Sequence, residues 1–302
     1  MSNLEGRTIF MSGGSRGIGE AIAVAAARQG ANVVIAAKTD QPHPKLPGTI
    51  HSACEAIEAA GGRALGLVCD IRDEKAVQAS VEQAADHFGG IDIVVNNASA
   101  IQLTPTAATK VSRFDLMTGI NSRGTFVVTQ ACLPHLLESD HARILTLSPP
   151  LDFNPGWFRN HAAYSLAKYG MSILTMGWAA EFSGKIAANC LWPRTAVDTA
   201  AVRNLLGGSG MASMSRTPEI MGDSASAILN KGIDFTGWCC LDDLVLAAEG
   251  VTDFDQYAVT PGAKLQLDFF FPHDAPAPEN ADGMVGWQAE ALPGRYAAPE
   301  AD

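Results

Sequence analysis

Short apolar segments rich in Val, Ile and Leu alternate along this chain with longer segments of helical periodicity. Continuously apolar strands separated by helices are typical of a parallel sheet covered on both faces. The pattern therefore predicts an α/β fold, a Rossmann-type doubly wound parallel sheet of about seven strands that binds ligands at the carboxyl ends of its strands. The strands are expected at residues 7–12, 32–37, 64–69, 91–95, 143–148 and 186–192, with a seventh around 264–271. The helices are expected at about 18–29, 50–60, 73–88, 113–138 and 161–183.

Two segments differ from this pattern. Residues 39–49 carry three prolines and are predicted to form a loop after the second strand. Residues 272–302 carry five prolines, and six acidic residues against one Arg. We expect a single domain over residues 1–271 and a Pro/Ala-rich acidic tail over 272–302, either flexible or packed on the domain or a neighbouring subunit through Trp287 and Tyr296.

Composition narrows the classes of function. The net charge of -11 and the lack of a basic stripe argue against nucleic acid as a partner. The apolar stretches are too short to cross a bilayer, so no membrane insertion is expected. No secretory signal is visible, which favours a cytoplasmic protein whose six cysteines are buried free thiols. No His/Cys cluster has metal-ligand spacing, so we expect no metal site.

A glycine-rich turn lies between the first strand and the first helix. Its glycines permit a tight turn and close approach to a pyrophosphate, and the helix N-terminus offers free N–H groups to the same anion. The turn therefore predicts a dinucleotide site. The residues expected to contact the phosphates are Gly13, Gly14, Ser15, Arg16, Gly17, Ile18 and Gly19.

The residue that ends the second strand indicates which dinucleotide binds. An acidic residue there would bind the ribose hydroxyls and repel a 2′-phosphate, whereas this chain has Lys38. Arg16 is expected to point toward the same corner, and two converging cations favour a phosphate dianion. The predicted cofactor is NADP.

Two later strand ends should complete the cofactor site. Asp70 and Ile71 follow the third strand, where a carboxylate can meet the adenine amino group. Asn97 and Ala98 follow the fourth strand, where small residues let the backbone pass close to the ribose. Their order after the glycine turn supports a nucleotide-binding role.

Tyr164 and Lys168 lie four residues apart in a helical stretch, so they share one helix face. An ammonium close to a phenol favours the phenolate, which would let Tyr164 exchange a proton with an alcohol or carbonyl during hydride transfer. Lys168 would also hold the nicotinamide ribose. The pair is predicted to be catalytic and to contact the cofactor.

Together these motifs resemble the short-chain dehydrogenase/reductase family over roughly residues 5–272. The resemblance places the family's active-site Tyr, Lys and helix Asn on Tyr164, Lys168 and Asn121, and implies that Asn121 supports a water relay from the lysine. Segments such as 147–151, 154–158, 192–196 and 252–257 look more narrowly like the hydroxysteroid dehydrogenase-like 2 subgroup. We expect this chain to lack that subgroup's C-terminal sterol-carrier domain and its peroxisomal location.

The chain departs from the family at two positions. The family's catalytic serine falls on Pro149, and Ser148 precedes it by one residue, which in a regular strand reverses the side chain's direction. Ser148 remains a candidate catalytic residue, because the Pro-Pro turn that follows it could redirect its side chain toward the site. Arg194 replaces the usual glycine after Pro193, and either contacts an acidic substrate or caps a loop, while Thr195 or Thr199 could reach the nicotinamide carboxamide.

The substrate is expected to lie between the loops at 150–160 and 194–216. These loops contribute side chains that either line an apolar cleft or belong to the core or a subunit contact: Phe153, Trp157, Phe158, Trp192, Met211 and Met214. The leading hypothesis is an NADP-dependent oxidoreductase acting on a small apolar alcohol or carbonyl of lipid, terpenoid or steroid type. The resemblance also implies a homodimer or homotetramer paired through the helices at 113–138 and 161–183.

Two other functions remain open at this point. A chain that has proline in place of the catalytic serine could bind NADP with little turnover and act in regulation or lipid binding. An isomerase, epimerase or dehydratase on the same scaffold would use bound nucleotide without net consumption.

Overall fold

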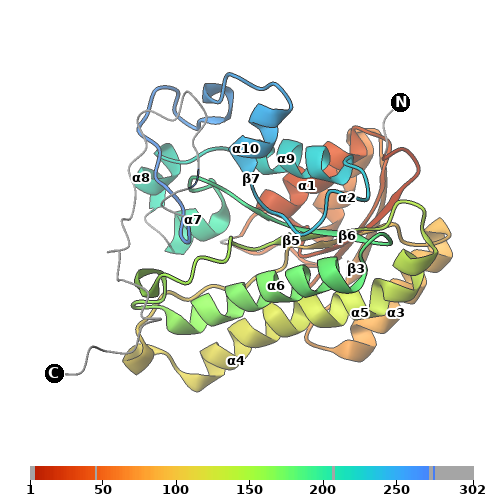
Figure 1. Ribbon diagram of the computed structural model, residues 1–302, viewed down its shortest axis with the longest axis horizontal. Helices are drawn as coiled ribbons and strands as arrows, with labels where there is room; N and C mark the ends of the chain where they lie inside the picture. The colour runs from red at the N-terminus through yellow and green to blue at the C-terminus, as the bar shows by residue number, and fades with distance from the viewer. Residues whose placement is uncertain (1–3, 45, 206–207, 272–274, 276–302) are drawn as a thin grey trace, which may run out of the picture.

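The computed structural model describes residues 4–44, 46–205, 208–271 and 275 (Figure 1). Its centre is a seven-stranded parallel sheet of order β3-β2-β1-β4-β5-β6-β7. The strands are β1 Thr8–Ser12, β2 Asn32–Ala37, β3 Arg63–Val68, β4 Ile93–Asn96, β5 Arg143–Leu147, β6 Ala187–Trp192 and β7 Cys239–Leu241. The predicted Rossmann-type doubly wound fold is confirmed. The order reverses between β1 and β4, which is where such folds bind their ligands.

Helices cover both faces of the sheet (Figure 1). One layer contains α1 Gly17–Ala27, α2 Ile50–Ala59, α9 Glu219–Leu229 and α10 Asp242–Ala248. The other contains α3 Glu74–Phe88, α4 Val111–Ile120, α5 Ser122–Glu138 and α6 Ala162–Glu181. The short helices α7 Ala200–Leu205 and α8 Gly208–Ser213 lie in the connection after β6.

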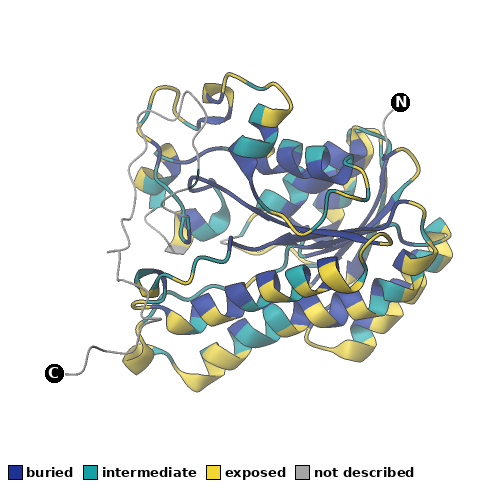
Figure 2. Ribbon diagram, viewed as in Figure 1, coloured by how far each residue is buried: buried dark blue, intermediate teal, exposed yellow. Residues whose placement is uncertain are grey.

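Each face of the sheet has its own apolar core, because successive strand residues point to opposite faces. Ile9 and Ile35 belong to the core that contains α1 and α9, whereas Phe10 and Val34 belong to the core that contains α3 and α5. Figure 2 shows the central strands buried and the helices buried mainly on their inner sides, whereas the edge strand β3 is largely half-buried or exposed. This double burial explains why the strands are continuously apolar in sequence.

The seventh predicted strand was wrong in its position. The edge strand is Cys239–Leu241, only three residues long, whereas residues 264–271 lie outside the sheet and form an isolated antiparallel bridge between Thr195 and Leu267. The apolar character of Phe269–Phe271 comes from packing into an aromatic cluster rather than from a place in the sheet. The predicted helix at 113–138 is divided into α4 and α5 at Asn121.

Local side-chain caps define the segments on either side of the predicted cofactor site. The proline-rich 39–49 loop ends at Thr49, whose hydroxyl accepts a hydrogen bond from the Ser52 N–H (3.1 Å), while the Ser52 hydroxyl accepts one from the Thr49 N–H (2.9 Å). The Asp73 carboxylate caps α3 by accepting from the backbone N–H groups of Lys75 at 3.0 Å and Ala76 at 3.2 Å. These caps satisfy N–H groups that the first turn of a helix leaves free.

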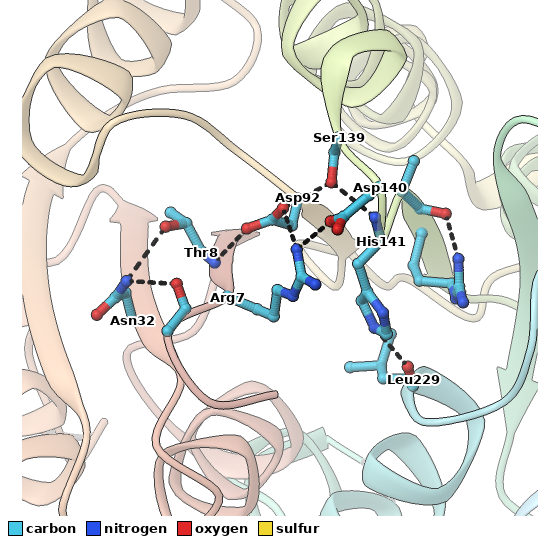
Figure 3. Close-up of polar contacts among 11 residues, drawn as sticks. Arg7, Thr8, Asn32, Asp92, Ser139, Asp140, His141 and Leu229 are labelled. Carbon is cyan, nitrogen blue, oxygen red and sulfur yellow. Dashed lines mark hydrogen bonds and ion pairs between the residues drawn. The ribbon is translucent and has the colours of Figure 1, made fainter. Parts of the chain in front are cut away.

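A polar network closes the amino ends of the strands (Figure 3). Asp92 accepts hydrogen bonds from the Thr8 N–H at 2.8 Å and the Ser139 hydroxyl at 2.6 Å, and it pairs with Arg7 at 3.3 Å. The His141 ring bonds the Leu229 carbonyl at 3.0 Å. The polar groups at this edge are therefore engaged with one another, which leaves the carboxyl edge for ligands.

Candidate active site

The glycine turn is tightly packed against the end of β4. A Cβ on Gly13, whose φ is +74°, would lie 2.8 Å from the Ala98 Cα, and a Cβ on Gly19 would lie 2.5 Å from the Asn97 Nδ2. The Asn97 amide donates to the Gly13 carbonyl at 2.8 Å. Side chains are excluded from this turn, so its backbone and the N-terminus of α1 can approach a phosphate.

Ser12 is a positioning residue that the sequence analysis did not identify. Its hydroxyl accepts hydrogen bonds from the backbone N–H groups of Asn97 and Ala98, both at 3.2 Å. Ser12 is also the last residue of β1 and pairs in register with Asn96 of β4. The position of Ser12 directly before Gly13, at the start of the glycine turn, could have identified it from the sequence. The contacts fix the two strand ends that flank the predicted pyrophosphate position.

At the predicted adenosine-binding end of the cofactor site, two cationic side chains, Lys38 and Arg72, surround the carboxylate of Asp70. Lys38 follows β2, has a 60% exposed side chain, and pairs with Asp70 at 3.1 Å. Asp70 also pairs with Arg72 at 2.5 Å, and the Arg72 guanidinium holds the pKa of this carboxyl well below its usual range. A carboxylate can accept further hydrogen bonds, so Asp70 remains able to meet an amino group. Ile71 is buried beside it.

Arg16 lies at the junction of the glycine turn and the 39–49 loop. Its guanidinium donates to the Gly48 carbonyl at 3.0 Å, and Gly48, at φ +79°, packs so closely that a Cβ there would lie 2.4 Å from the Ser15 carbonyl oxygen. Burial lowers the pKa of Arg16. Its Nε is buried and has no hydrogen-bond partner among the described residues. A cationic side chain with one unsatisfied donor at the start of α1 fits a phosphate ligand.

A cleft of about 1210 Å³ begins at Arg16 and the N-terminus of α1 and extends along α1 as far as Arg28. Its lining includes Arg16, Gly17, Ile18, Ser99 and Thr199. The cleft, the bare glycine turn and the orphaned Arg16 donor together fit a dinucleotide lying along the carboxyl edge of the sheet.

Helix α6 brings Tyr164 and Lys168 to the carboxyl ends of β5 and β6. Lys168 is 3% exposed; its ammonium donates to the Leu147 carbonyl at 2.6 Å and lies 4.9 Å from the centre of the Trp192 ring. Burial lowers the pKa of Lys168 to about 7, against an opposing effect of Asp268. Tyr164 is 5% exposed, and burial raises the pKa of its phenol above the usual value.

The electrostatics therefore differ from the sequence-based expectation. We expected the lysine ammonium to lower the pKa of the Tyr164 phenol, but burial dominates and Asp268 raises it further. The ammonium of Lys168 is instead engaged by the Leu147 carbonyl. Asp268 is a second residue that the sequence did not identify as part of the site, because its segment was interpreted as a strand.

Asn121 is fully buried at the junction of α4 and α5. Its side-chain oxygen accepts from the Ala100 N–H at 2.7 Å, and its amide donates to the Ala100 carbonyl at 3.1 Å. This side chain therefore ties the helix break to the loop after β4. No described contact links it to Lys168, so its role in a water relay stays a prediction.

Ser148 and Pro149 follow β5 as expected. Ser148 is fully buried beside the Cys190 thiol of β6, and its hydroxyl has no partner in hydrogen-bonding geometry among the described residues. The Pro149 carbonyl accepts a hydrogen bond from Ser172 of α6 at 2.6 Å. No described contact directs Ser148 to Tyr164, and its catalytic role stays a prediction.

The loop after β6 places both candidate threonines on the cofactor side. Thr195 is fully buried, and its hydroxyl has no partner within the described part of the chain. The Thr199 methyl lies 3.4 Å from where a Cβ on Gly17 would be. An orphaned hydroxyl shortly after the carboxyl end of β6 fits a ligand such as the carboxamide.

Arg194 holds the loop after β6 in place. Its guanidinium is 2% exposed, pairs with Asp243 and lies 4.6 Å from the centre of the Phe271 ring. Its backbone N–H donates to Asp242 at 2.9 Å. Of the two roles considered for Arg194, these contacts favour the one that stabilises the loop.

The candidate substrate residues divide into two groups. Trp157 and Trp192 are buried with Tyr164 in one aromatic cluster, and Phe158 packs against it. Phe153 is 58% exposed and contacts Tyr169, with ring centres 6.0 Å apart. The surroundings of Tyr164 are therefore strongly apolar.

Comparison with known proteins identifies the class to which this fold and site belong. The family model described as short chain dehydrogenase matches residues 7–207, and the chain belongs to that family. Members are oxidoreductases that bind a nicotinamide dinucleotide.

The predicted resemblance to the hydroxysteroid dehydrogenase-like 2 subgroup is also confirmed. The chain is 54% identical to hydroxysteroid dehydrogenase-like protein 2 of Xenopus tropicalis over 299 residues, which is 99% of this chain and 72% of that protein. It is 57% identical to the Danio rerio protein and 54% identical to the Homo sapiens protein, each over 88% of this chain. It spans only 64% of the length of each of these two relatives.

Two solved structures share the fold over nearly the whole described domain. A short chain dehydrogenase from Mycobacterium thermoresistibile is 50% identical with a TM-score of 0.87, covering 93% of this chain and 100% of that chain. A protein from Xanthomonas campestris is 54% identical with a TM-score of 0.86, covering 89% and 99% respectively.

The described residues bear on membrane insertion and on metal binding. There, none of the helices has the length and apolar character needed to cross a membrane. The same residues contain no group of three or more His, Cys, Asp or Glu side chains placed to hold a metal ion.

Proposed function

We propose that this protein is an NADP(H)-dependent oxidoreductase that interconverts an apolar alcohol and its carbonyl, with Tyr164 as proton donor and acceptor. The observation that carries the proposal is that α6 places Tyr164 and Lys168 at the carboxyl edge of the sheet, the edge at which the glycine turn also lies. Family membership supports the reaction class. The substrate is of lipid, terpenoid or steroid type.

The dinucleotide supplies or accepts a hydride when it is bound. The Tyr164 phenol gives a proton to the oxygen of the carbonyl as negative charge develops there, and takes it back in the reverse direction. Because burial raises the pKa of this phenol, Tyr164 keeps its proton until such charge appears. Lys168, with a pKa of about 7, can exchange a proton near neutral pH.

Preference for NADP is supported by the cations at the adenosine corner. Within the described part of the chain, the Nε of Arg16 has no partner, and Lys38 is exposed and pairs with the Asp70 carboxylate that also binds Arg72. A 2′-phosphate would add charge-assisted hydrogen bonds to both cations. The carboxylate of Asp70 next to Lys38 does not prevent this, because its own charge is shared with Arg72.

A second candidate function is supported by Pro149. The family's catalytic serine position is occupied by this proline, and Ser148 lies beside Cys190 instead. Loss of one hydrogen bond to a developing oxyanion costs about 3 kcal/mol, or about a hundredfold in rate. The chain would then bind NADP with little turnover and serve a regulatory or lipid-binding role.

The assembly and location are part of the same proposal. Apolar side chains on the outer faces of α5 and α6 are exposed, including Phe126 at 41%, Leu166 at 58% and Ile173 at 54%. Such faces support a homodimer or homotetramer paired through these helices. All six cysteines are free thiols, which supports a reducing compartment such as the cytoplasm.

A panel of ketones and alcohols tests the reaction. The purified protein is mixed with NADPH or NADP and the absorbance of the reduced nicotinamide is followed with terpenoid, steroid and long-chain substrates, and with small sugars as the contrast. We expect turnover of apolar members, with NADPH preferred to NADH. Activity confined to small polar sugars would contradict the proposed substrate class.

A further inference from the structure

The segment Leu265–Phe271, here called the strap, crosses the candidate active site and is attached to the loop after β6. Three backbone hydrogen bonds join it to that loop, and the indole N–H of Trp192, the last residue of β6, donates a fourth. They join Gln266 N to Met214 O at 2.8 Å, Ala196 N to Gln266 O at 2.8 Å, Asp268 N to Arg194 O at 2.9 Å and Trp192 Nε1 to Phe269 O at 2.7 Å.

The strap places the Phe270 ring directly against the candidate catalytic tyrosine. Phe270 is fully buried, and its ring is nearly parallel to that of Tyr164, with an interplanar angle of 29° and a centre-to-centre distance of 6.0 Å. Other rings surround it, with centres 5.2 Å away for Tyr169, 6.0 Å for His161 and 6.2 Å for both Trp157 and Trp192. Phe270 thus occupies an aromatic box next to Tyr164.

The backbone is strained to hold the ring there. Phe270 has φ +64°, in the left-handed region that costs a residue with a Cβ about 1–2 kcal/mol. Burial of a phenylalanine ring stabilises by about 1.5–3 kcal/mol, which offsets that cost. Burial of the Phe270 ring, together with the hydrogen bonds described above, therefore holds the strap in place despite the strained backbone at Phe270.

In this state Tyr164 is separated from the cofactor cleft. Tyr164 is 5% exposed and is not among the residues that line the 1210 Å³ cleft, although Gly17 and Thr199 are. Proton transfer requires the substrate oxygen within about 3 Å of the phenol oxygen. A substrate that approaches Tyr164 must therefore take space that the strap now fills.

Opening of the strap would require a hinge, and Gly262 has the position and freedom to serve as one. Gly262, at φ +74°, lies three residues before it in an exposed turn, and a Cβ there would contact nothing within 4 Å. A glycine in an open turn can absorb large backbone rotations. The hydrogen bonds to the loop after β6 must break or shift in the same motion.

We propose that the strap is a gate over the active site and that Phe270 is its specificity-determining residue. The substrate replaces the Phe270 ring beside Tyr164, so the group next to the reacting carbon is flat, apolar and about the size of one ring. This inference rests on the proposed oxidoreductase function and specifies its substrate further. A polar or strongly branched group would not fit among Trp157, Trp192 and Tyr169.

A reversible disulfide tests the gate in the full-length protein. Met214→Cys and Gln266→Cys are introduced together, because these residues are joined by a backbone hydrogen bond across the strap contact. Oxidation should lower turnover of ketone substrates at least tenfold, and dithiothreitol should restore it. The oxidised wild type controls for the native thiols. An oxidised double variant with the turnover of its reduced form would overturn the gate.

Hydrogen exchange tests the gate without any turnover, so that failure of the gate and failure of the proposed reaction can be distinguished. The N–H groups of Gln266 and Asp268 should exchange through a local opening at a rate that low denaturant does not change, and oxidation of the double variant should slow them at least tenfold. Exchange only through global unfolding would contradict the gate, whether or not the panel shows activity.

The specificity claim is tested by Phe270→Leu, with Phe88→Leu as the matched control. Phe88 ends α3 and packs against Arg63, outside the aromatic cluster around Tyr164. Phe270→Leu keeps an apolar side chain, and thermal unfolding verifies that it folds. Its ratio of kcat/KM for bulky over single-ring ketones should rise at least tenfold, while Phe88→Leu leaves the ratio unchanged. An unchanged ratio in folded Phe270→Leu would refute the assignment.

Discussion

Substitution of Lys168 by Met should stabilise the ligand-free protein while removing its activity. The ammonium of Lys168 is buried, and its pKa falls from 10.5 to about 7. Each pKa unit is worth 1.36 kcal/mol, so the charged form is disfavoured in the folded state by about 5 kcal/mol. Met removes this cost but leaves the Leu147 carbonyl without its donor, which costs about 1–3 kcal/mol. The net gain at pH 6 is about 2–4 kcal/mol, or about 3–7 °C in Tm for a chain of this length.

The pH dependence of this gain gives the sharper test. The folded pKa lies below the unfolded one, so between about pH 7 and 10.5 the unfolded chain binds more protons and wild-type stability rises with pH. The advantage of Lys168→Met is therefore full below pH 7 and shrinks toward pH 10.5. Urea unfolding from pH 6 to 9.5 measures it, with the exposed Lys185→Met as control. A variant less stable than wild type at pH 6, or an advantage that grows with pH, would refute the reasoning.

Three further predictions concern the cofactor site. Arg16→Ala and Lys38→Ala should each weaken NADPH binding about 10- to 100-fold and NADH binding much less, measured by calorimetry; equal losses for both dinucleotides would contradict the phosphate corner. Gly19→Ala should weaken NADPH binding at least tenfold and destabilise by about 1–3 kcal/mol, because its Cβ would lie 2.5 Å from the Asn97 amide. Thr195→Val should leave the ligand-free Tm unchanged or raised, since the hydroxyl has no partner among the described residues, and should weaken NADPH binding about tenfold. A lowered Tm with unchanged NADPH affinity would show that this hydroxyl is structural.

The sequence predicted the parts of the molecule whose chemistry is local. The strand, glycine turn and helix that begin the fold follow from apolar runs and from glycines, and Gly13 and Gly19 indeed leave no room for a Cβ. The spacing of Tyr164 and Lys168 placed them on one helix face, and α6 confirms that they lie in the same helix. Such features depend on residues a few positions apart.

The parts that could not be predicted depend on contacts between distant segments. The apolar run at 264–271 has the composition of a strand, and only the fold shows that Phe270 packs among rings from α6 and β6. The true edge strand, Cys239–Leu241, is too short to give a pattern. The direction of the pKa shift at Tyr164 depends on burial by the strap, which sequence spacing does not reveal.

The most direct test of the central claim compares wild type with Tyr164→Phe. NADPH binding is measured by calorimetry, and turnover of a ketone from the panel by absorbance. The account predicts that NADPH affinity stays within about twofold while kcat falls at least a hundredfold, because only the proton donor is lost. Tyr164→Phe that turns over at the wild-type rate would contradict the account.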